Sequence, residues 1–315
     1  MPTESSPAAA AFNPARERLV GLACAIAVVA IWTGFSLSSR FATHQALTPW
    51  DVAALRYLGS FPLGLALGAW TGWPRLPVGR SLGLMATAAF GFPLCAYAGF
   101  QLAPAAHGVV FLTGTLPFMA ALLGLLFLRE PFPPRRWISL GIVALGILLL
   151  AAGSVEAAPG AWRGDLLFLL GSLSWAGFTV MLRLWQVPAA AATVVLAVYP
   201  PLLYLPVWWL ALPSSMAAAS TGAILHQLIY QGVLAMVVAG FLFARAVNAL
   251  GSAQTTTITA LTPAMVTLAA GPVLGEWLGW GGMLGALLVS LGMAFGVAAP
   301  WRRVPAVVDA PAPRG

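Results

Sequence analysis

Charge is what this sequence has least of. Only 7% of its 315 residues are charged and 60% are hydrophobic, whereas roughly a quarter of the residues in an average soluble domain are charged. So few charges cannot cover the surface of a soluble protein. Because a helix needs about 20 apolar residues to cross the hydrocarbon of a bilayer, the chain has material for about ten crossings.

Lysine is absent, and all 15 basic residues are arginines that stand singly or in pairs between apolar stretches. No basic run is interleaved with aromatic residues, so the net charge of +7 indicates membrane orientation rather than a nucleic-acid partner. Cys24 and Cys95 each lie alone in an apolar stretch without CxxC or Cys/His spacing. We expect them to be inert packing residues, and we expect no metal site.

Catalytic motifs are absent as well. The sequence contains no HExxH, no G-x-S-x-G, no G-x-x-x-x-G-K loop and no close pair of aspartates within a span. We therefore expect that the protein is not an enzyme and has no cofactor.

Apolar stretches broken by Gly, Pro and Arg predict an all-α membrane protein with ten transmembrane helices. Runs this long without alternating polarity favour helices over a barrel. The predicted spans are 19–39, 52–70, 81–101, 105–128, 137–153, 165–184, 191–211, 223–243, 251–271 and 279–299.

The arginines predict how these spans are oriented. With the N-terminus inside, only Arg40, Arg56 and Arg163 fall toward the outside, which follows the positive-inside rule. We expect a multi-pass protein of a bacterial inner membrane with both termini cytoplasmic. The polar N-terminal stretch leads directly into a full-length span, so residues 1–18 are expected to be a disordered tail rather than a signal peptide, and 300–315 a second cytoplasmic tail.

An internal repeat is the most informative feature. LTGTLPFMAALLGLLFLREPF aligns with ITALTPAMVTLAAGPVLGEWL, placing Pro117 on Pro263 and Glu130 on Glu276 at an offset of 146 residues. IWTGFSLSSR aligns with SWAGFTVMLR at an offset of 143 residues, which places Trp32 on Trp175. The predicted repeats are residues 19–153 and 164–299. Because each contains five helices, an odd number, the second is inverted in the membrane.

The order of these motifs resembles the EamA-type branch of the drug/metabolite transporter superfamily. The resemblance rests on IWTGF, TPWDVAALRYL, the two proline-containing stretches above, RRWISLGIVALGILLL and GDLLFLLGSLSWAGFTVMLR. It implies two inverted five-helix repeats, a central cavity and transport of small metabolites, often export of amino acids or related compounds. It leaves the substrate open.

Arg56 is the ionisable residue that lies most clearly within a predicted span, and such residues are functional candidates because charge is costly in a bilayer. One reading is a cation that faces the cavity and binds a substrate carboxylate or phosphate. The other is a snorkelling arginine near the outer interface that pairs with Asp51 or caps a neighbouring helix.

Several aromatic and polar residues are further candidates for lining a cavity, although such residues also pack helices or form interfacial belts. The candidates are Trp32, Tyr97, Gln101, Trp175, Phe178, Tyr230 and Gln231. Helical spacing places His226 over Tyr230 and Gln227 over Gln231. Four residues at matched repeat positions are expected to be structural: Glu130 and Glu276 as network anchors, and Pro117 and Pro263 as kinks or hinges.

We expect a secondary-type exporter of small metabolites such as amino acids that works by alternating access. A passive facilitator or channel and an exporter of cationic drugs stay open as alternatives. The expected partners are the small-molecule substrate and the lipid bilayer, with the protein a monomer. Every acidic residue falls in a tail, in a loop or at a span end, so no carboxylate proton relay is expected and only His107 and His226 remain as titrating groups near the spans.

Overall fold

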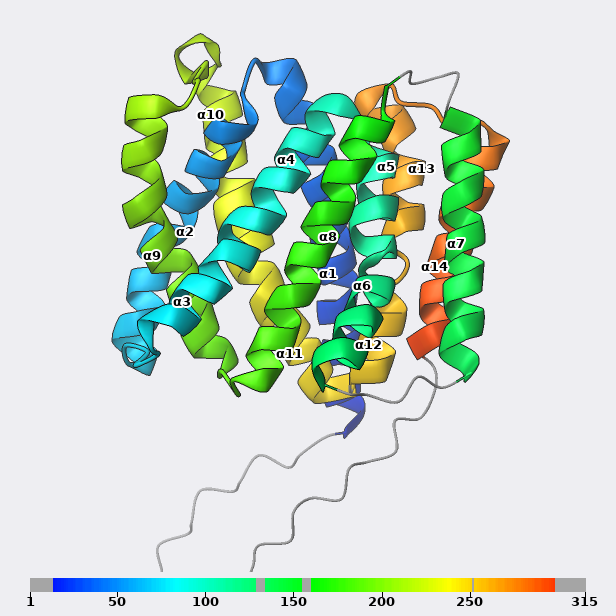
Figure 1. Ribbon diagram of the computed structural model, residues 1–315, viewed down its shortest axis with the longest axis horizontal. Coiled ribbons are helices and arrows are strands. Elements are labelled where there is room, and N and C mark those ends of the chain that lie inside the picture. The colour runs from blue at the N-terminus through cyan, green and yellow to red at the C-terminus, as the bar shows by residue number, and fades with distance from the viewer. Residues whose placement is uncertain (1–13, 129–133, 155–159, 251, 298–315) are drawn as a thin grey trace, which may run out of the picture.

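The structure is a computed structural model that describes residues 14–128, 134–154, 160–250 and 252–297. Within these ranges it contains helices and turns but no strand, in agreement with the predicted all-α class. The helices form one bundle, and all the long ones run between its two ends (Figure 1). We call the end at which α1 finishes the upper end, as it is drawn in Figure 1, and the opposite end the lower end.

The helices of the first half are α1 (Pro14–Phe41), η1 (Ala42–Gln45), α2 (Pro49–Thr71), α3 (Val78–Leu84), η2 (Met85–Gly91), α4 (Phe92–Leu102), α5 (Ala105–Val109), η3 (Val110–Gly114), α6 (Leu116–Leu123), η4 (Gly124–Leu128) and α7 (Pro134–Ser154). Those of the second half are α8 (Trp162–Leu184), α9 (Ala189–Ala211), η5 (Met216–Ala218), α10 (Thr221–Gln227), η6 (Leu228–Val238), α11 (Ala239–Leu250), α12 (Ser252–Thr259), α13 (Thr262–Leu274) and α14 (Trp280–Val297).

Within the described residues, eight continuous helical stretches are long and apolar enough to cross a membrane. The other two predicted spans fall on α7 and α14, which stand side by side at the right-hand edge of Figure 1. A multi-pass membrane protein therefore follows, while the count of ten crossings stays a prediction.

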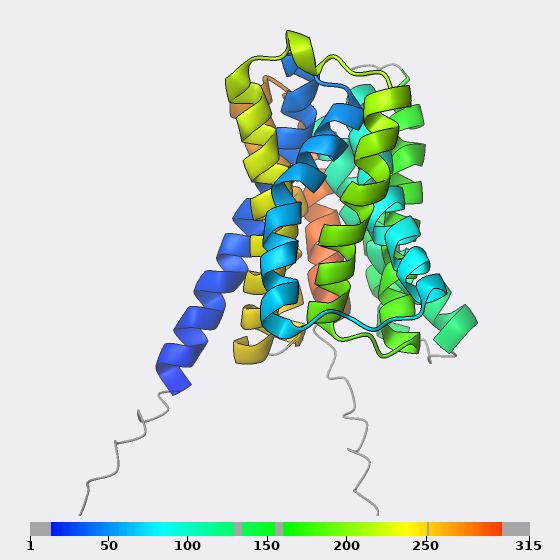
Figure 2. The ribbon, with the colours of Figure 1, turned by 90° about the vertical axis from the view of Figure 1, so that its left-hand side faces the viewer.

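The predicted boundary of the N-terminal tail was wrong, because α1 begins at Pro14 and residues 14–18 of the predicted tail are helical. Figure 2 shows α1 leaning away from the bundle toward its lower end.

The two halves run in opposite directions through the bundle. α1 rises to the upper end, whereas α8 begins there, where a Cβ on Gly164 would lie 2.8 Å from the backbone oxygen of Gly99 near the end of α4 (Figure 1). Helix pairing has the same symmetry. α1 packs on α11 and η6, α8 packs on α4 and η2, and α7 packs on α14. This is the arrangement expected of an inverted repeat.

Three of the long helical stretches contain four π-helical segments, η2, η3, η4 and η6, and such turns are uncommon and frequently occur at functional sites. Two of them, η2 and η6, begin at Met85 and Leu228, 143 residues apart, the same offset that relates Trp32 to Trp175. A π-helical turn changes the direction in which successive side chains and carbonyls point. Matching positions in the two halves are therefore distorted in the same way.

Close backbone contacts hold η6 against α2. A Cβ on Gly59 would lie 2.3 Å from the carbonyl oxygen of Leu228, and a Cβ on Gly232 would lie 2.7 Å from that of Arg56. Only glycine fits at this crossing, which follows the small-residue packing common between membrane helices. The crossing brings Arg56 next to η6.

Pro117 and Pro263 do not lie in the middle of regular helices, as a simple kink would require. Each occupies the first turn of a helix that starts again after a break, α6 and α13 respectively. A threonine hydroxyl also donates to a backbone oxygen of the preceding turn at each break, from Thr115 to the Phe111 oxygen at 2.5 Å and from Thr262 to the Thr259 oxygen at 2.7 Å. The matched prolines thus mark matched helix breaks.

Candidate functional site

A cluster of buried polar side chains joins the first half of the chain to the second. It draws residues from α1, α2, α4 and the α10–η6 stretch. We call it the central cluster, and its members are Ser38, Ser39, Arg56, Tyr97, Gln227 and Gln231.

Gln231 lies at the middle of this cluster and is fully buried. Its Oε1 accepts a hydrogen bond from the Tyr97 hydroxyl at 3.2 Å. Its Nε2 donates to Ser39 Oγ at 3.1 Å and to Gln227 Oε1 at 3.3 Å. The last contact confirms the helical spacing predicted for Gln227 and Gln231, and the others link η6 to α4 and α1.

Gln227 continues the cluster along the same helix toward the upper end. Its Nε2 donates to the Ser38 backbone oxygen at 2.9 Å, and its Oε1 accepts from Ser38 Oγ at 3.1 Å. Ser38 Oγ also contacts His226 Nε2 at 2.9 Å. The His226 ring lies 5.6 Å from that of Tyr230, as their spacing predicted. Tyr230 is half-buried and donates to the Ile31 oxygen at 3.3 Å, so it packs beside the cluster.

Arg56 enters the cluster from α2. It lies seven residues after Pro49, or about 10 Å from the upper start of the helix. The residue is only 7% exposed, and its Nη1 donates to the Gln231 backbone oxygen at 3.3 Å. Its guanidinium also approaches the Tyr97 hydroxyl. Arg56 is therefore buried between helices rather than snorkelling to the interface, and its role as a cavity cation that binds a substrate anion stays a prediction.

The alternative pairing of Arg56 with Asp51 is wrong, because Asp51 is occupied elsewhere. Asp51 forms a capping box with Thr48 at the start of α2, and its carboxylate accepts bonds from Trp208 Nε1 at 3.0 Å and Ser214 Oγ at 2.6 Å. The backbone N–H of Ser215 adds a bond of 3.0 Å. These donors satisfy the carboxylate without a cation, and they tie α2 to the α9–α10 connection.

Aromatic rings extend from Tyr97 toward α8. Phe35 lies 6.1 Å from Tyr97 and 6.2 Å from Phe92, measured between ring centroids. Phe92 lies 4.8 Å from Trp175, which lies 5.2 Å from Phe178. We call these five rings the aromatic row. It places three predicted site residues, Tyr97, Trp175 and Phe178, in one row of ring contacts.

Two other predicted site residues lie outside the central cluster and the aromatic row. Trp32 stacks on Phe243 of α11 at 5.6 Å and is half-buried. Gln101 is exposed near the upper end, where its Nε2 donates to the Leu47 oxygen at 3.2 Å. Both contacts are between neighbouring segments, so the structure gives Trp32 and Gln101 packing and anchoring roles.

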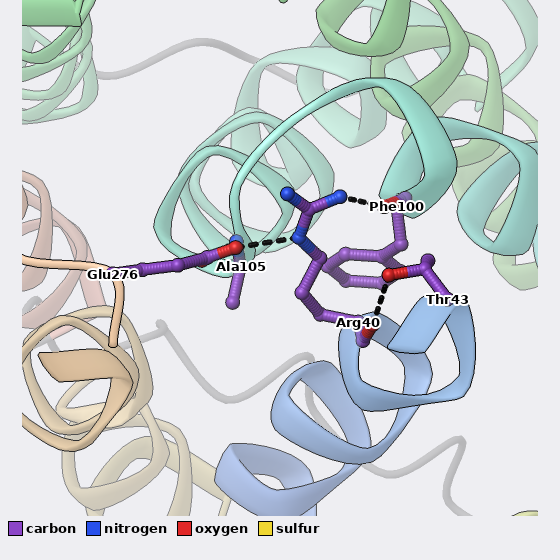
Figure 3. A network of polar contacts seen from close by, with 5 residues as sticks. All are labelled: Arg40, Thr43, Phe100, Ala105 and Glu276. Atoms are coloured by element: carbon purple, nitrogen blue, oxygen red, sulfur yellow. Dashed lines mark hydrogen bonds and ion pairs between the residues drawn. The ribbon is translucent and has the colours of Figure 1, made fainter. Parts of the chain in front are cut away.

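An ion pair joins Arg40, near the upper end of α1, to Glu276 (Figure 3). Arg40 Nε is 2.5 Å from Glu276 Oε1, and Arg40 Nη1 donates to the Phe100 oxygen at 2.7 Å. The second carboxylate oxygen of Glu276 accepts from the backbone N–H of Ala105 at 2.8 Å. We call this set the upper latch. It joins α1, α4, α5 and the segment after α13, and so connects both halves.

Local sequence explains how Glu276 reaches this position. Gly275 ends α13 in the left-handed conformation, with φ of 73°, and the N–H of Glu276 bonds back to the Ala270 oxygen at 3.2 Å. Such glycine caps turn the chain sharply away from the helix axis. The carboxylate is then directed at the first N–H groups of α5, where negative charge is favourable. Glu276 thus contacts both α1 and α5, and its role as an anchor stays a prediction.

A second acidic group lies near the latch. His107 in α5 is buried, and its Nδ1 is 2.8 Å from Asp165 Oδ1 at the start of α8. Its Nε2 is a buried atom without a hydrogen-bond partner in the described part of the chain. His107 thus lies near the start of its predicted span, and its partner Asp165 was not predicted.

Glu130, the predicted counterpart of Glu276, lies outside the described residues. The sequence also did not single out Ser38, Ser39 or the Arg40–Glu276 pairing. For Asp51, the Thr48-x-x-Asp51 spacing is a capping-box signal that could have revealed its role. No comparable local signal exists for the serines, because their partners lie about 190 residues away.

A model of the EamA-like transporter family matches the chain twice, over residues 19–152 and 162–297. The chain belongs to the EamA-like transporter family. The double match coincides with the two oppositely running halves of the structure, so each half of this EamA-like transporter corresponds to one family unit. The central cluster and the upper latch both join one unit to the other.

Curated relatives of this EamA-like transporter include two proteins of Bacillus subtilis (strain 168). The chain is 29% identical to "Uncharacterized transporter YdfC" over 186 residues, 58% of this chain and 56% of the relative. It is 24% identical to "Uncharacterized transporter YetK" over 195 residues, 60% of this chain and 59% of the relative. The matched region thus spans less than two thirds of either relative.

A solved structure, titled only as the crystal structure of a protein, aligns with a TM-score of 0.61 at 17% identity. The alignment covers 89% of this chain and 96% of that chain. At this identity the likeness establishes a common fold.

Proposed function

We propose that this EamA-like transporter exports small metabolites, such as amino acids, across a bacterial inner membrane by alternating access between its two halves. The observation that carries the proposal is the central cluster. Its buried polar groups lie at the contact between the halves, within helices that are otherwise apolar. Polar groups inside a membrane bundle mark solute pathways when they face one another between repeats.

The upper latch supports the same mechanism. Alternating access requires contacts that close one end of the pathway and can be broken. The Arg40–Glu276 pair meets this requirement, because it lies near the upper end of α1 and both side chains are partly exposed, at 20% and 17%. In the proposed mechanism, these two side chains separate when the upper end opens.

The sidedness of export depends on the upper end facing away from the cytoplasm. The arginine distribution places Gly315 inside and the Glu156 loop outside. Reporter fusions at these two positions are expected to indicate opposite sides of the membrane. Reporters on the same side would contradict the five crossings predicted between the Glu156 loop and Gly315.

Counterflow in proteoliposomes tests transport directly. The full chain is reconstituted with unlabelled amino acids inside, and uptake of labelled amino acids is measured alongside nucleosides, sugars and cationic drugs. We expect saturable uptake of amino acids that depends on the internal solute. Non-saturating flux would instead favour a passive facilitator, and uptake restricted to cations would favour a drug exporter.

A matched pair of variants relates this flux to the proposed site. Gln231→Ala removes the central amide of the cluster, whereas Gln101→Ala removes an exposed amide near the upper end of the same bundle. We expect the first to lose most uptake at unchanged protein abundance and the second to retain it. Equal activity of the two variants would place the solute pathway elsewhere.

A further inference from the structure

Most charged side chains of the described bundle have a partner for their charge or for their hydrogen-bonding groups. Arg40 pairs with Glu276 and Arg245 with Glu17, and the Asp165 carboxylate contacts His107 Nδ1. Asp51 is satisfied by neutral donors, as described above. Arg56 is the exception, because no carboxylate of the described residues lies within ion-pair distance of this buried cation.

Because Arg56 is buried, its lack of an acidic partner among the described residues is informative about function. An arginine at membrane depth is costly unless an anion or several acceptors meet it, and its guanidinium has five N–H donors. Its Nη1 donates to the Gln231 carbonyl at a long 3.3 Å, and its guanidinium also forms a hydrogen bond with the Tyr97 hydroxyl. The Tyr97 hydroxyl beside it is already turned toward Gln231 Oε1. Both partners of Arg56 are neutral, so no anion among the described residues balances its positive charge.

The residues around Arg56 also favour the binding of an anion. Around Arg56 the cluster offers hydroxyl and amide groups of Tyr97, Gln227 and Gln231 and no acidic group, so nothing there would repel a carboxylate. Planar guanidinium matches a carboxylate through two parallel hydrogen bonds. The aromatic row begins at Tyr97 and offers an apolar surface to the remainder of a small molecule.

We infer that Arg56 is the anion-binding group of the transport site and that the substrate is a small carboxylate with an apolar portion. This inference rests on the proposed function and names its substrate class. Tyr97 and Gln231 add neutral hydrogen bonds beside the carboxylate. The aromatic row then selects apolar side chains.

Binding to the purified full chain in detergent tests the inference without requiring transport. The probes are pairs that differ only at the carboxylate: L-leucine with L-leucinamide, and L-phenylalanine with L-phenylalaninamide. We expect the acids to raise the midpoint of thermal unfolding at concentrations about ten- to hundredfold lower than the amides, as the loss of a charge-assisted bond implies. Equal effects of acid and amide, or no effect of any acid, would overturn it.

Variants at position 56 separate recognition from folding. Arg56→Gln is expected to remove the preference for the acids while the protein without ligand keeps its elution profile. Arg56→Lys keeps the charge without the planar pair of donors, so it is expected to retain the preference with weaker binding. If Arg56→Gln does not fold, Arg56→Lys decides the matter, because unchanged acid binding in a folded lysine variant contradicts bidentate recognition.

Counterflow with the same pairs distinguishes the two proposals. Uptake of amides as readily as acids would leave a transporter but exclude carboxylate recognition. Binding of acids through Arg56 without counterflow of any solute would uphold the inference and contradict alternating-access transport. A preference for acids in both assays, lost together in Arg56→Gln, supports both.

Discussion

The upper latch gives a prediction whose magnitude follows from the structure. Glu276→Gln keeps the size of the side chain but removes its charge, which changes the contacts to Arg40 and to the N–H of Ala105. A hydrogen bond to a charged group contributes about 1.5–3 kcal/mol, against about 0.5–1.5 kcal/mol for a neutral one. We therefore expect the closed upper end to lose about 1–2 kcal/mol relative to the open one, a population change of roughly 5- to 30-fold.

Cysteine accessibility measures this change. Ser39 lies between the latch and Gln231 and is buried, so a cysteine introduced there by Ser39→Cys reacts with a membrane-impermeant thiol reagent only when the upper end opens. The native Cys24 and Cys95 are first replaced by alanine. The reaction rate is expected to rise about 5- to 30-fold when Glu276→Gln is added, in proportion to the open population.

A second ion pair provides the control. Arg245 and Glu17 lie 2.6 Å apart and join α11 to the lower part of α1. Arg245→Gln breaks a pair of similar length at the opposite end, so it should leave the reactivity at position 39 at or below its starting value. An unchanged rate in Glu276→Gln, or an equal rise in Arg245→Gln, would refute the assignment of a latch to the upper end.

Three further predictions follow from other contacts. Asp51→Ala leaves the buried Trp208 indole N–H without an acceptor, so the midpoint of thermal unfolding in detergent should fall by an amount equivalent to about 3 kcal/mol. Asp51→Asn should lower this midpoint less, and equal midpoints for the two variants would contradict the role of Asp51 as a cap. Gly232→Val should abolish stable protein because its Cβ meets the backbone of α2, while Gly240→Val, where nothing lies within 4 Å, should preserve it; comparison of detergent-extracted yields decides. A pH gradient at clamped membrane potential should not drive net solute accumulation, because each described carboxylate in the bundle is engaged by a cap or an ion pair; accumulation that disappears in His107→Ala would show proton coupling.

Sequence reasoning succeeded where a feature depends on local pattern. Long apolar runs located the helices to within a few residues, and the four-residue spacing placed Gln227 against Gln231. The repeat offset placed Pro117 and Pro263 at equivalent helix breaks. In each case the determining interaction lies within one helix or follows from the duplication.

The remaining errors concern contacts between distant segments. Asp51 and Arg56 are close in sequence, so a pairing between them was a reasonable expectation. In the structure, Trp208 and Ser214 supply the donors for Asp51 instead. Gln101 looked like a cavity residue, but the end of α4 carries it into the exposed upper loops. Hydropathy contains no information on which helices become neighbours. The partners of Arg40 and Arg56 could therefore be found only in three dimensions.

Amino acid counterflow compared between the full chain and its Arg56→Gln variant tests the central claim most directly. Both proteins are reconstituted at equal density with unlabelled L-leucine inside, and uptake of labelled L-leucine and L-leucinamide is followed. The account predicts saturable uptake of the acid over the amide by the unmodified chain and loss of this preference in Arg56→Gln. Uptake of the acid that is unchanged by the substitution would contradict the assignment of Arg56 to the transport site.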